Sequence, residues 1–348
     1  MYRVGTERSA DMSTTSIPNA SRFTAASFSL LPLLALIGCS TIQVKLGMKV
    51  TLTKTPVASI EASLPKDPGI APGEKSPLVV AVTEPDGTIL LTQGKGKGKV
   101  LWSELTVAPS VVTVNKKGVL SLAPDPRVSD GKTGHVTITV PSHPGIQTQL
   151  DIPLHYDYPF VSSYSGNSGN NGLNGTDGVS GIPGTPGNLD PDNPSAGGNG
   201  GNGTNGTDGS NGGDGDNGPP LAVYVALRAG AHPLLQVGIT TPGHKERFYL
   251  VDPQGGSLTI NDLGGAGGQG GKGGHGGAGG SGGVGIPSGS SGSNGTDGQD
   301  GRSGSDGAGG PITVSCDPAA APYLAAIHFS NPGGPKPSIS QAPVPPLW

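Results

Sequence analysis

The apolar positions of this chain fall in short runs rich in β-branched residues, separated by Gly, Pro and Asp. This pattern predicts strands and turns, and no substantial α-helix outside the first 38 residues. The runs before residue 160 are spaced as in a β-sandwich. They lie at 50–53, 78–82, 89–92, 111–114, 119–122, 135–140 and 148–152.

A second group of apolar runs follows after residue 160. Four predicted strands fall in residues 219–263, and others flank that region. They lie at 160–164, 221–227, 234–239, 246–251, 257–260, 312–316 and 325–329. The Pro-rich segment 332–348 is expected to be extended.

Between these strands, glycine recurs at every third residue in four blocks of equal length: 166–187, 197–218, 264–285 and 289–310. Three residues per turn, at about 3.1 Å per residue, is the repeat of an extended left-handed helix. Each block would form a rod of roughly 65–70 Å. The order strand–rod–rod–strand occurs twice, so we expect two hairpins of rods on one β base.

Three structures are compatible with this repeat. A collagen triple helix needs many imino acids at the other positions, and the blocks contain few of them. Gly, Ser and Asn tracts also form flexible linkers. The third structure, which we favour, is a bundle of polyglycine II helices within one chain, resembling a springtail antifreeze protein and some phage adhesin tips.

The residues between the glycines support the bundle. Two of the three faces of block 264–285 are all glycine, so this rod should be the most enclosed. One column of block 197–218 is entirely Asn or Asp, which suits a wet surface. Leu173, Val179 and Ile182 share a column of block 166–187, and we expect them to make an apolar contact.

The N-terminus has the pattern of an export signal. Arginines precede an apolar run at 28–38, and Cys39 follows at once. The run is too short to span a bilayer. Leu-Ile-Gly-Cys at 36–39 resembles the lipobox of bacterial lipoproteins. The resemblance implies cleavage before Cys39 and lipidation of Cys39, and Ser40 favours the outer membrane. The alternatives are an ordinary signal peptide with an incidental cysteine, or an uncleaved anchor. Met1 and Met12 both remain possible starts.

Two other features belong to the β-rich region of the sequence. Segments from Leu101 to Val140 loosely resemble bacterial immunoglobulin-like repeats of surface proteins, which implies that Trp102 belongs to the core. If Cys39 carries lipid, Cys316 has no partner within the chain. We expect Cys316 to be a small buried hydrophobic residue.

Little in the sequence points to chemistry. The net charge of −4 argues against nucleic-acid binding, which favours a basic protein surface. The basic loop at 94–99 is interpreted as a solvated loop in preference to a binding patch. The histidines lack metal-ligand spacing. The aspartates of the blocks resemble those of calcium-binding nonapeptide repeats, but the aliphatic position of those repeats is missing. No catalytic residue, cofactor or metal site is expected, and the protein is not expected to be an enzyme.

The sequence therefore predicts a mainly β protein with four parts: a lipoprotein signal peptide (1–38), an Ig-like β-sandwich (39–160), a glycine-repeat module with its β insert (161–331) and a Pro-rich tail (332–348). We expect a lipoprotein of the bacterial cell envelope, in the outer membrane or at the cell surface, with a structural or adhesive role. A collagen-like trimeric stalk, or a module that binds carbohydrate, ice or calcium, are the alternatives. The membrane is the one expected partner, and the oligomeric state is left open.

Overall fold

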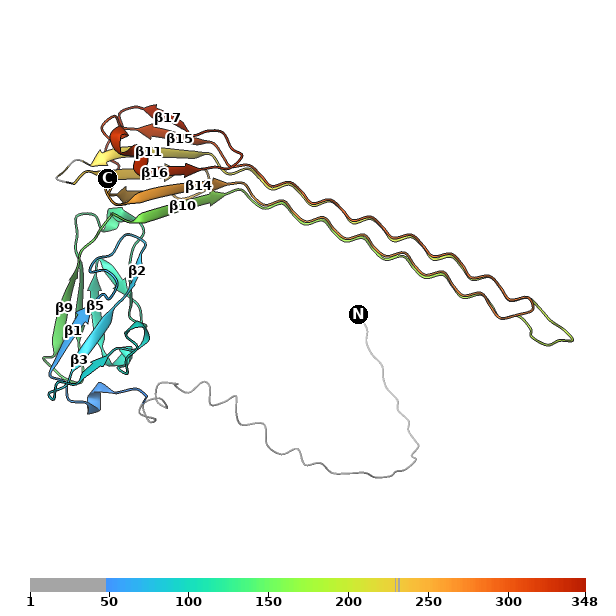
Figure 1. Ribbon diagram of the computed structural model, residues 1–348, viewed down its shortest axis with the longest axis horizontal. Helices are drawn as coiled ribbons and strands as arrows, with labels where there is room; N and C mark the ends of the chain where they lie inside the picture. The colour runs from blue at the N-terminus through green and yellow to red at the C-terminus, as the bar shows by residue number, and fades with distance from the viewer. Residues whose placement is uncertain (1–47, 229, 231) are drawn as a thin grey trace, which may run out of the picture.

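The computed structural model describes residues 48–228, 230 and 232–348. They form two β units and one long, thin arm (Figure 1). The mainly β fold class is confirmed. Helical structure in this part of the chain is limited to short 3-10 segments, at Leu52–Lys54, Gly94–Gly96, Trp102–Glu104, Pro126–Val128 and Ala321–Ala326.

The first β unit contains nine strands: β1 (Ser59–Ser63), β2 (Lys75–Pro77), β3 (Val79–Thr83), β4 (Ile89–Leu91), β5 (Thr106–Ser110), β6 (Val112–Val114), β7 (Val119–Leu122), β8 (Gly134–Thr139) and β9 (Gln147–Ile152). They make three three-stranded antiparallel sheets, in the orders β1-β3-β4, β2-β7-β6 and β5-β8-β9. The first unit therefore has three small sheets, whereas a regular β-sandwich has two.

One apolar core holds these three sheets together. Strand β8 alternates buried and half-buried residues, so Val136 and Ile138 point inward. Trp102 lies in the same core with 6% of its surface exposed, as the sequence predicted. The turn at 84–88 closes the β3–β4 hairpin, with the N–H of Gly87 donating to the carbonyl of Glu84.

One predicted strand of this unit was wrong, and three strands were missed. Residues 50–53 are not a strand: Val50 forms one isolated bridge to Val100, and a 3-10 turn follows. The N–H of Leu52 donates to the carboxylate of Glu104 at 3.0 Å. In a strand, this N–H would donate to the carbonyl of a neighbouring strand. Strands β1, β2 and β5 were not predicted. Strand β5 contains Pro109 and lies at a sheet edge, where proline is tolerated.

The second β unit contains two sheets packed on one core. Its strands are β10 (Pro159–Ser165), β11 (Leu221–Arg228), β12 (Leu234–Thr240), β13 (Arg247–Val251), β14 (Ser257–Leu263), β15 (Ile312–Cys316), β16 (Ile327–Ser330) and β17 (Ser338–Gln341). The sheet β10-β14-β16 is parallel, and the sheet β13-β12-β11-β15-β17 is mixed. Tyr164 of the parallel sheet and Val223 of the mixed sheet both belong to this core.

The duplication predicted from sequence is visible in this pairing. The strands that lead into the two glycine hairpins, β10 and β14, pair in parallel, with Phe160 opposite Leu258. The strands that lead out, β11 and β15, also pair in parallel, with Leu221 opposite Ile312. Region 219–263 and the flanking strands therefore form one β base, as expected.

The C-terminal segment differs from the expectation of an extended tail. Residues 338–341 form β17, which adds to the mixed sheet beside β15. The last residue also contacts the first unit, since the indole N–H of Trp348 donates to Asp130 at 2.9 Å. Arg228 pairs with the same carboxylate. Arg127 lies over the ring of Phe248 at 3.7 Å. These contacts fix the first unit against the base.

Candidate functional site: the glycine-rod arm

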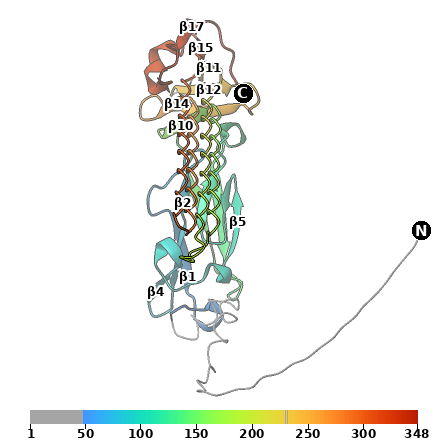
Figure 2. The ribbon, with the colours of Figure 1, turned by 90° about the vertical axis from the view of Figure 1, so that its right-hand side faces the viewer.

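Four rods leave the β base together and form the arm (Figures 1 and 2). Rod 1 (166–187) continues β10, and rod 2 (197–218) returns to β11. Rod 3 (264–285) continues β14, and rod 4 (289–310) returns to β15. Rods 1 and 3 thus run outward, whereas rods 2 and 4 run back. The turns at 188–196 and 286–288 form the tip.

Backbone hydrogen bonds between the rods repeat at every third residue. Glycines of rod 1 donate to carbonyls of rod 3 at 2.7–2.8 Å, as Gly175 does to Lys272. Glycines of rod 3 donate to rod 2, glycines of rod 4 to rod 3, and glycines of rod 2 to rod 4. A second series runs from rod 2 to rod 1. The rods therefore form one bundle within a single chain, and rods 2 and 3 occupy its middle.

Rod 3 is the most enclosed rod, as predicted. Its column of every third glycine from Gly265 to Gly283 is buried, and rod 3 is the one rod of the arm with a continuous buried column. A Cβ built on Gly271 would overlap the carbonyl oxygen of Leu173, and one on Gly270 would overlap that of Gly301. The obstacles are backbone atoms of neighbouring rods. They cannot move aside as a flexible side chain could, so only glycine fits here.

The Asn and Asp column of rod 2 has a structural role that the sequence analysis missed. Its side chains are exposed, as expected, but each one accepts a hydrogen bond from a backbone N–H of rod 4 at 2.7–2.9 Å. Asn205, for example, accepts the N–H of Thr296 at 2.9 Å. These N–H groups point away from any backbone carbonyl. The side-chain oxygens thus satisfy donors that the rod geometry leaves free.

Similar acceptors line the other seams of the arm. Asn171, Asn174 and Asp177 of rod 1 accept N–H groups of rod 3. Acceptors on rod 4 bind glycine N–H groups of rod 3, as Asp297 binds that of Gly276 at 2.7 Å. On rod 2, hydroxyl oxygens do the same for rod 1, and Thr204 accepts the N–H of Val179 at 2.7 Å. The period-three columns therefore stabilise the bundle as well as covering it.

The aspartates of the arm are engaged in these bonds and in exposed ion pairs. Asp300 accepts the N–H of Gly273 and pairs with Lys272 at 2.6 Å. The hydrogen bond from Lys272 lowers the pKa of Asp300. Asp297 lies 3.8 Å from His275. Among the described residues, no cluster of three or more His, Cys, Asp or Glu side chains has the geometry to hold a metal ion.

The apolar side chains of rod 1 remain mostly exposed, contrary to the expected apolar contact. Leu173, Val179 and Ile182 are 77%, 71% and 79% exposed. They point outward because the inward face of rod 1 is its glycine column, which rods 2 and 3 cover. Folding of the chain therefore does not bury them.

One buried carboxyl lies at the root of the arm. Asp262, the penultimate residue of β14, is fully buried, and neither oxygen has a hydrogen-bond partner. One of its oxygens and the carbonyl oxygens of Gly218 and Pro219 surround the position that a Cβ on Gly310 would take. Rods 2 and 4 rejoin the base at this point. Burial raises the pKa of Asp262 from 3.8 to about 6, against a smaller opposing effect of the Gly310 N–H.

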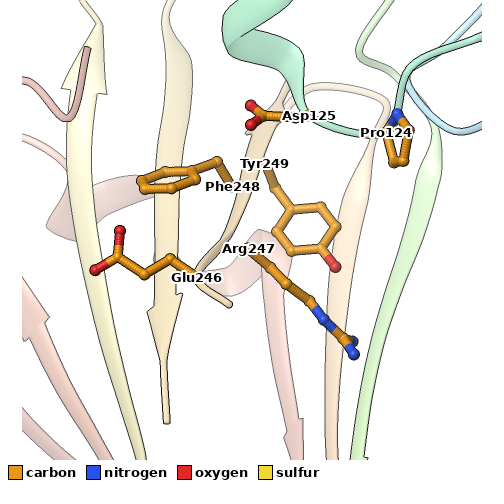
Figure 3. A pocket seen from close by; sticks show the side chains of 6 residues that line it. All are labelled: Pro124, Asp125, Glu246, Arg247, Phe248 and Tyr249. Carbon is orange, nitrogen blue, oxygen red and sulfur yellow. The ribbon is translucent and has the colours of Figure 1, made fainter. Parts of the chain in front are cut away.

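A cavity of about 350 Å³ lies between the two β units (Figure 3). Pro124 and Asp125 of the first unit form one side, and residues 246–249 of β13 and its approach form the other. Its ionic groups are largely engaged: Asp125 pairs with Arg127 at 2.8 Å, and Arg247 donates to Ser163. Arg247 also lies over the Tyr164 ring at 4.5 Å. The cavity is thus part of the contact between the two β units.

Cys39 lies outside the described residues, so the lipidation site remains a prediction. Cys316 is buried as expected, and burial raises the pKa of its thiol. No helix within the described residues is long and apolar enough to cross a membrane. Comparisons with family models, curated proteins and solved structures gave no match.

Proposed function

We propose that this protein is a lipoprotein of the bacterial cell envelope that holds a stiff structural or adhesive arm away from a membrane. The arm is the observation that carries the proposal. It places a narrow tip roughly 65–70 Å from the β base, and it is held by backbone hydrogen bonds along its whole length. The Leu-Ile-Gly-Cys motif at 36–39 supplies the membrane anchor.

The hydrogen bonding favours this single-chain arm over a collagen-like trimer. The glycine N–H groups and the glycine faces of rod 3 are already used within one chain. A triple helix would need the same glycines at the axis between three chains. The bundle and the triple helix are therefore mutually exclusive uses of one repeat.

The tip is the part of the arm that suits contact with another surface. Leu189 is 57% exposed and Ile286 is 49% exposed, in the turns that join the rods. Exposed aliphatic side chains at the end of a polar rod are available for adhesion, since they contribute little to the fold.

Expression in a Gram-negative host with a radiolabelled fatty acid tests the anchor. Wild-type protein should carry label and fractionate with membranes, and Cys39→Ala should lose both properties. A labelled Cys39→Ala product sensitive to globomycin would contradict lipidation at this residue.

For the adhesive role, Ile286→Asp should reduce attachment of expressing cells to host or abiotic surfaces, whereas Ala278→Asp on the side of the arm should not. Equal attachment by both variants would leave the arm a purely structural role.

A further inference from the structure

One side of the arm differs from the others in both charge and apolar character. We define the neutral face as every third residue from 170 to 185 on rod 1 together with every third residue from 198 to 213 on rod 2. The two columns are adjacent, because the N–H of Thr204 donates to the carbonyl of Val179 and the same bond repeats along the seam. We propose that the neutral face binds the same face of a second copy of this chain.

The distribution of aliphatic residues supports an interface here. The four rods contain four Leu, Ile or Val side chains, and three of them, Leu173, Val179 and Ile182, lie in the rod 1 column of this face. All three are at least 71% exposed. The rod 2 column beside them offers glycine, serine and threonine. The fold gains nothing from these aliphatic side chains, so their shared column is explained by contact with another surface.

Charge favours a second copy as that surface. The rods carry seven aspartates, one lysine and one arginine, so the arm is acidic. Each of the other outward columns includes an ionisable residue, such as Asp177, Asp214, Lys272, Arg302 or Asp300. Two arms that met through an acidic column would bring like charges together. The rod 2 column of the neutral face continues to Asp216 at the root of the arm, where Asn167 donates to its carboxylate at 3.0 Å. Within its bounds the neutral face contains no ionisable residue, so it can meet itself without that repulsion.

The shape of the molecule favours antiparallel pairing. The β units at the root are broader than the arm (Figure 2). Two arms in parallel, face to face, would bring both roots together at one end and hold the arms apart. In antiparallel pairing the roots lie at opposite ends, around a two-fold axis near Val179. Side chains about 9 Å apart along a column leave gaps for those of the partner.

The available area is sufficient for a reversible dimer. A length of about 50 Å and a width of two hydrogen-bonded rods, about 10 Å, give roughly 1,000 Å² for both copies together. Specific interfaces begin at about 1,000 Å², and those at this size are weak or transient. We therefore expect self-association in the micromolar range and not a permanent dimer.

Sedimentation equilibrium on the chain from residue 40 tests the proposal, since both cores and all four rods lie in residues 50–348. The average mass should rise toward twice the monomer mass between about 1 and 300 µM. Val179→Asp places two like charges near the axis and should weaken association at least ten-fold. Ala278→Asp lies at the same level on rod 3, adds the same charge and should have no effect.

Each result is decisive. A wild-type chain that stays monomeric throughout would overturn the proposal and leave the face to another kind of partner. Association that survives Val179→Asp, or that Ala278→Asp abolishes equally, would also overturn it. Both residues are exposed, so both variants should keep the wild-type thermal unfolding, which confirms that the comparison is between folded chains.

Discussion

The first β unit and the arm are stabilised in opposite ways. The first unit encloses a core of buried aliphatic side chains with Trp102, and its strands alternate inward apolar and outward polar residues. The arm has no such core. Its interior is glycine backbone, and its free donors are satisfied by carbonyls and by Asn, Asp, Ser and Thr side chains. The first unit thus needs side chains in its interior, whereas the interior of the arm has no room for them.

This contrast predicts that a methyl-bearing substitution is most harmful in the interior of the arm. In Gly271→Val the new Cβ meets the carbonyl of Leu173, and either rod must shift. We expect a loss of more than about 3 kcal/mol, beyond the ~1 kcal/mol of ordinary substitutions. Gln269→Val, on the outward column of the same rod, is the control and should be nearly silent. Circular dichroism melts check this, and equal effects at the two positions would indicate a disordered tract.

Removing an apolar side chain should, in contrast, destabilise the first unit more than the arm. Leu120 is fully buried in the first unit, so Leu120→Ala should cost about 2–5 kcal/mol in free energy of unfolding. Leu173→Ala on rod 1 makes the same chemical change at an exposed site and should cost less than about 0.5 kcal/mol. Denaturant unfolding at low protein concentration measures both. A comparable loss in the two variants would mean that the arm has an apolar contribution to its fold.

The stability of the folded chain should depend on pH through Asp262, which lies where the arm joins the β base. Asp262 has its pKa raised from 3.8 to about 6 in the folded chain. The folded state therefore holds a proton that the unfolded state releases, and stability falls as pH rises from about 4 to about 6. A protonated carboxyl can donate to a nearby carbonyl, which a carboxylate cannot. The expected loss is about 2 kcal/mol. Thermal melts of Asp262→Asn across this pH range should no longer show this pH-dependent loss of stability. If the variant loses stability with pH as the wild type does, Asp262 is not the cause.

The sequence predicted the arm better than the first unit. The glycine period defines rod lengths, pairing into hairpins and the enclosed position of rod 3, because only glycine permits such close approach. The role of residues such as Asn205 could not be predicted, since it depends on which column of rod 4 lies beside it. Strand β17 was missed because Ser338–Gln341 is short and follows prolines. Asp262 could have been found: β14 alternates, and residue 262 falls on its inward side with Leu258 and Ile260.

Amide hydrogen exchange of the glycine-labelled chain tests most directly whether the arm is a single-chain, hydrogen-bonded bundle. The account predicts that rod glycines whose N–H groups donate to backbone carbonyls, such as Gly175 and Gly274, are protected at micromolar concentration. Rod 3 glycines that donate only to side chains, such as Gly276, should exchange faster. Exchange of all rod glycines at the rate of an unfolded chain, or protection that appears only when the concentration rises, would contradict it.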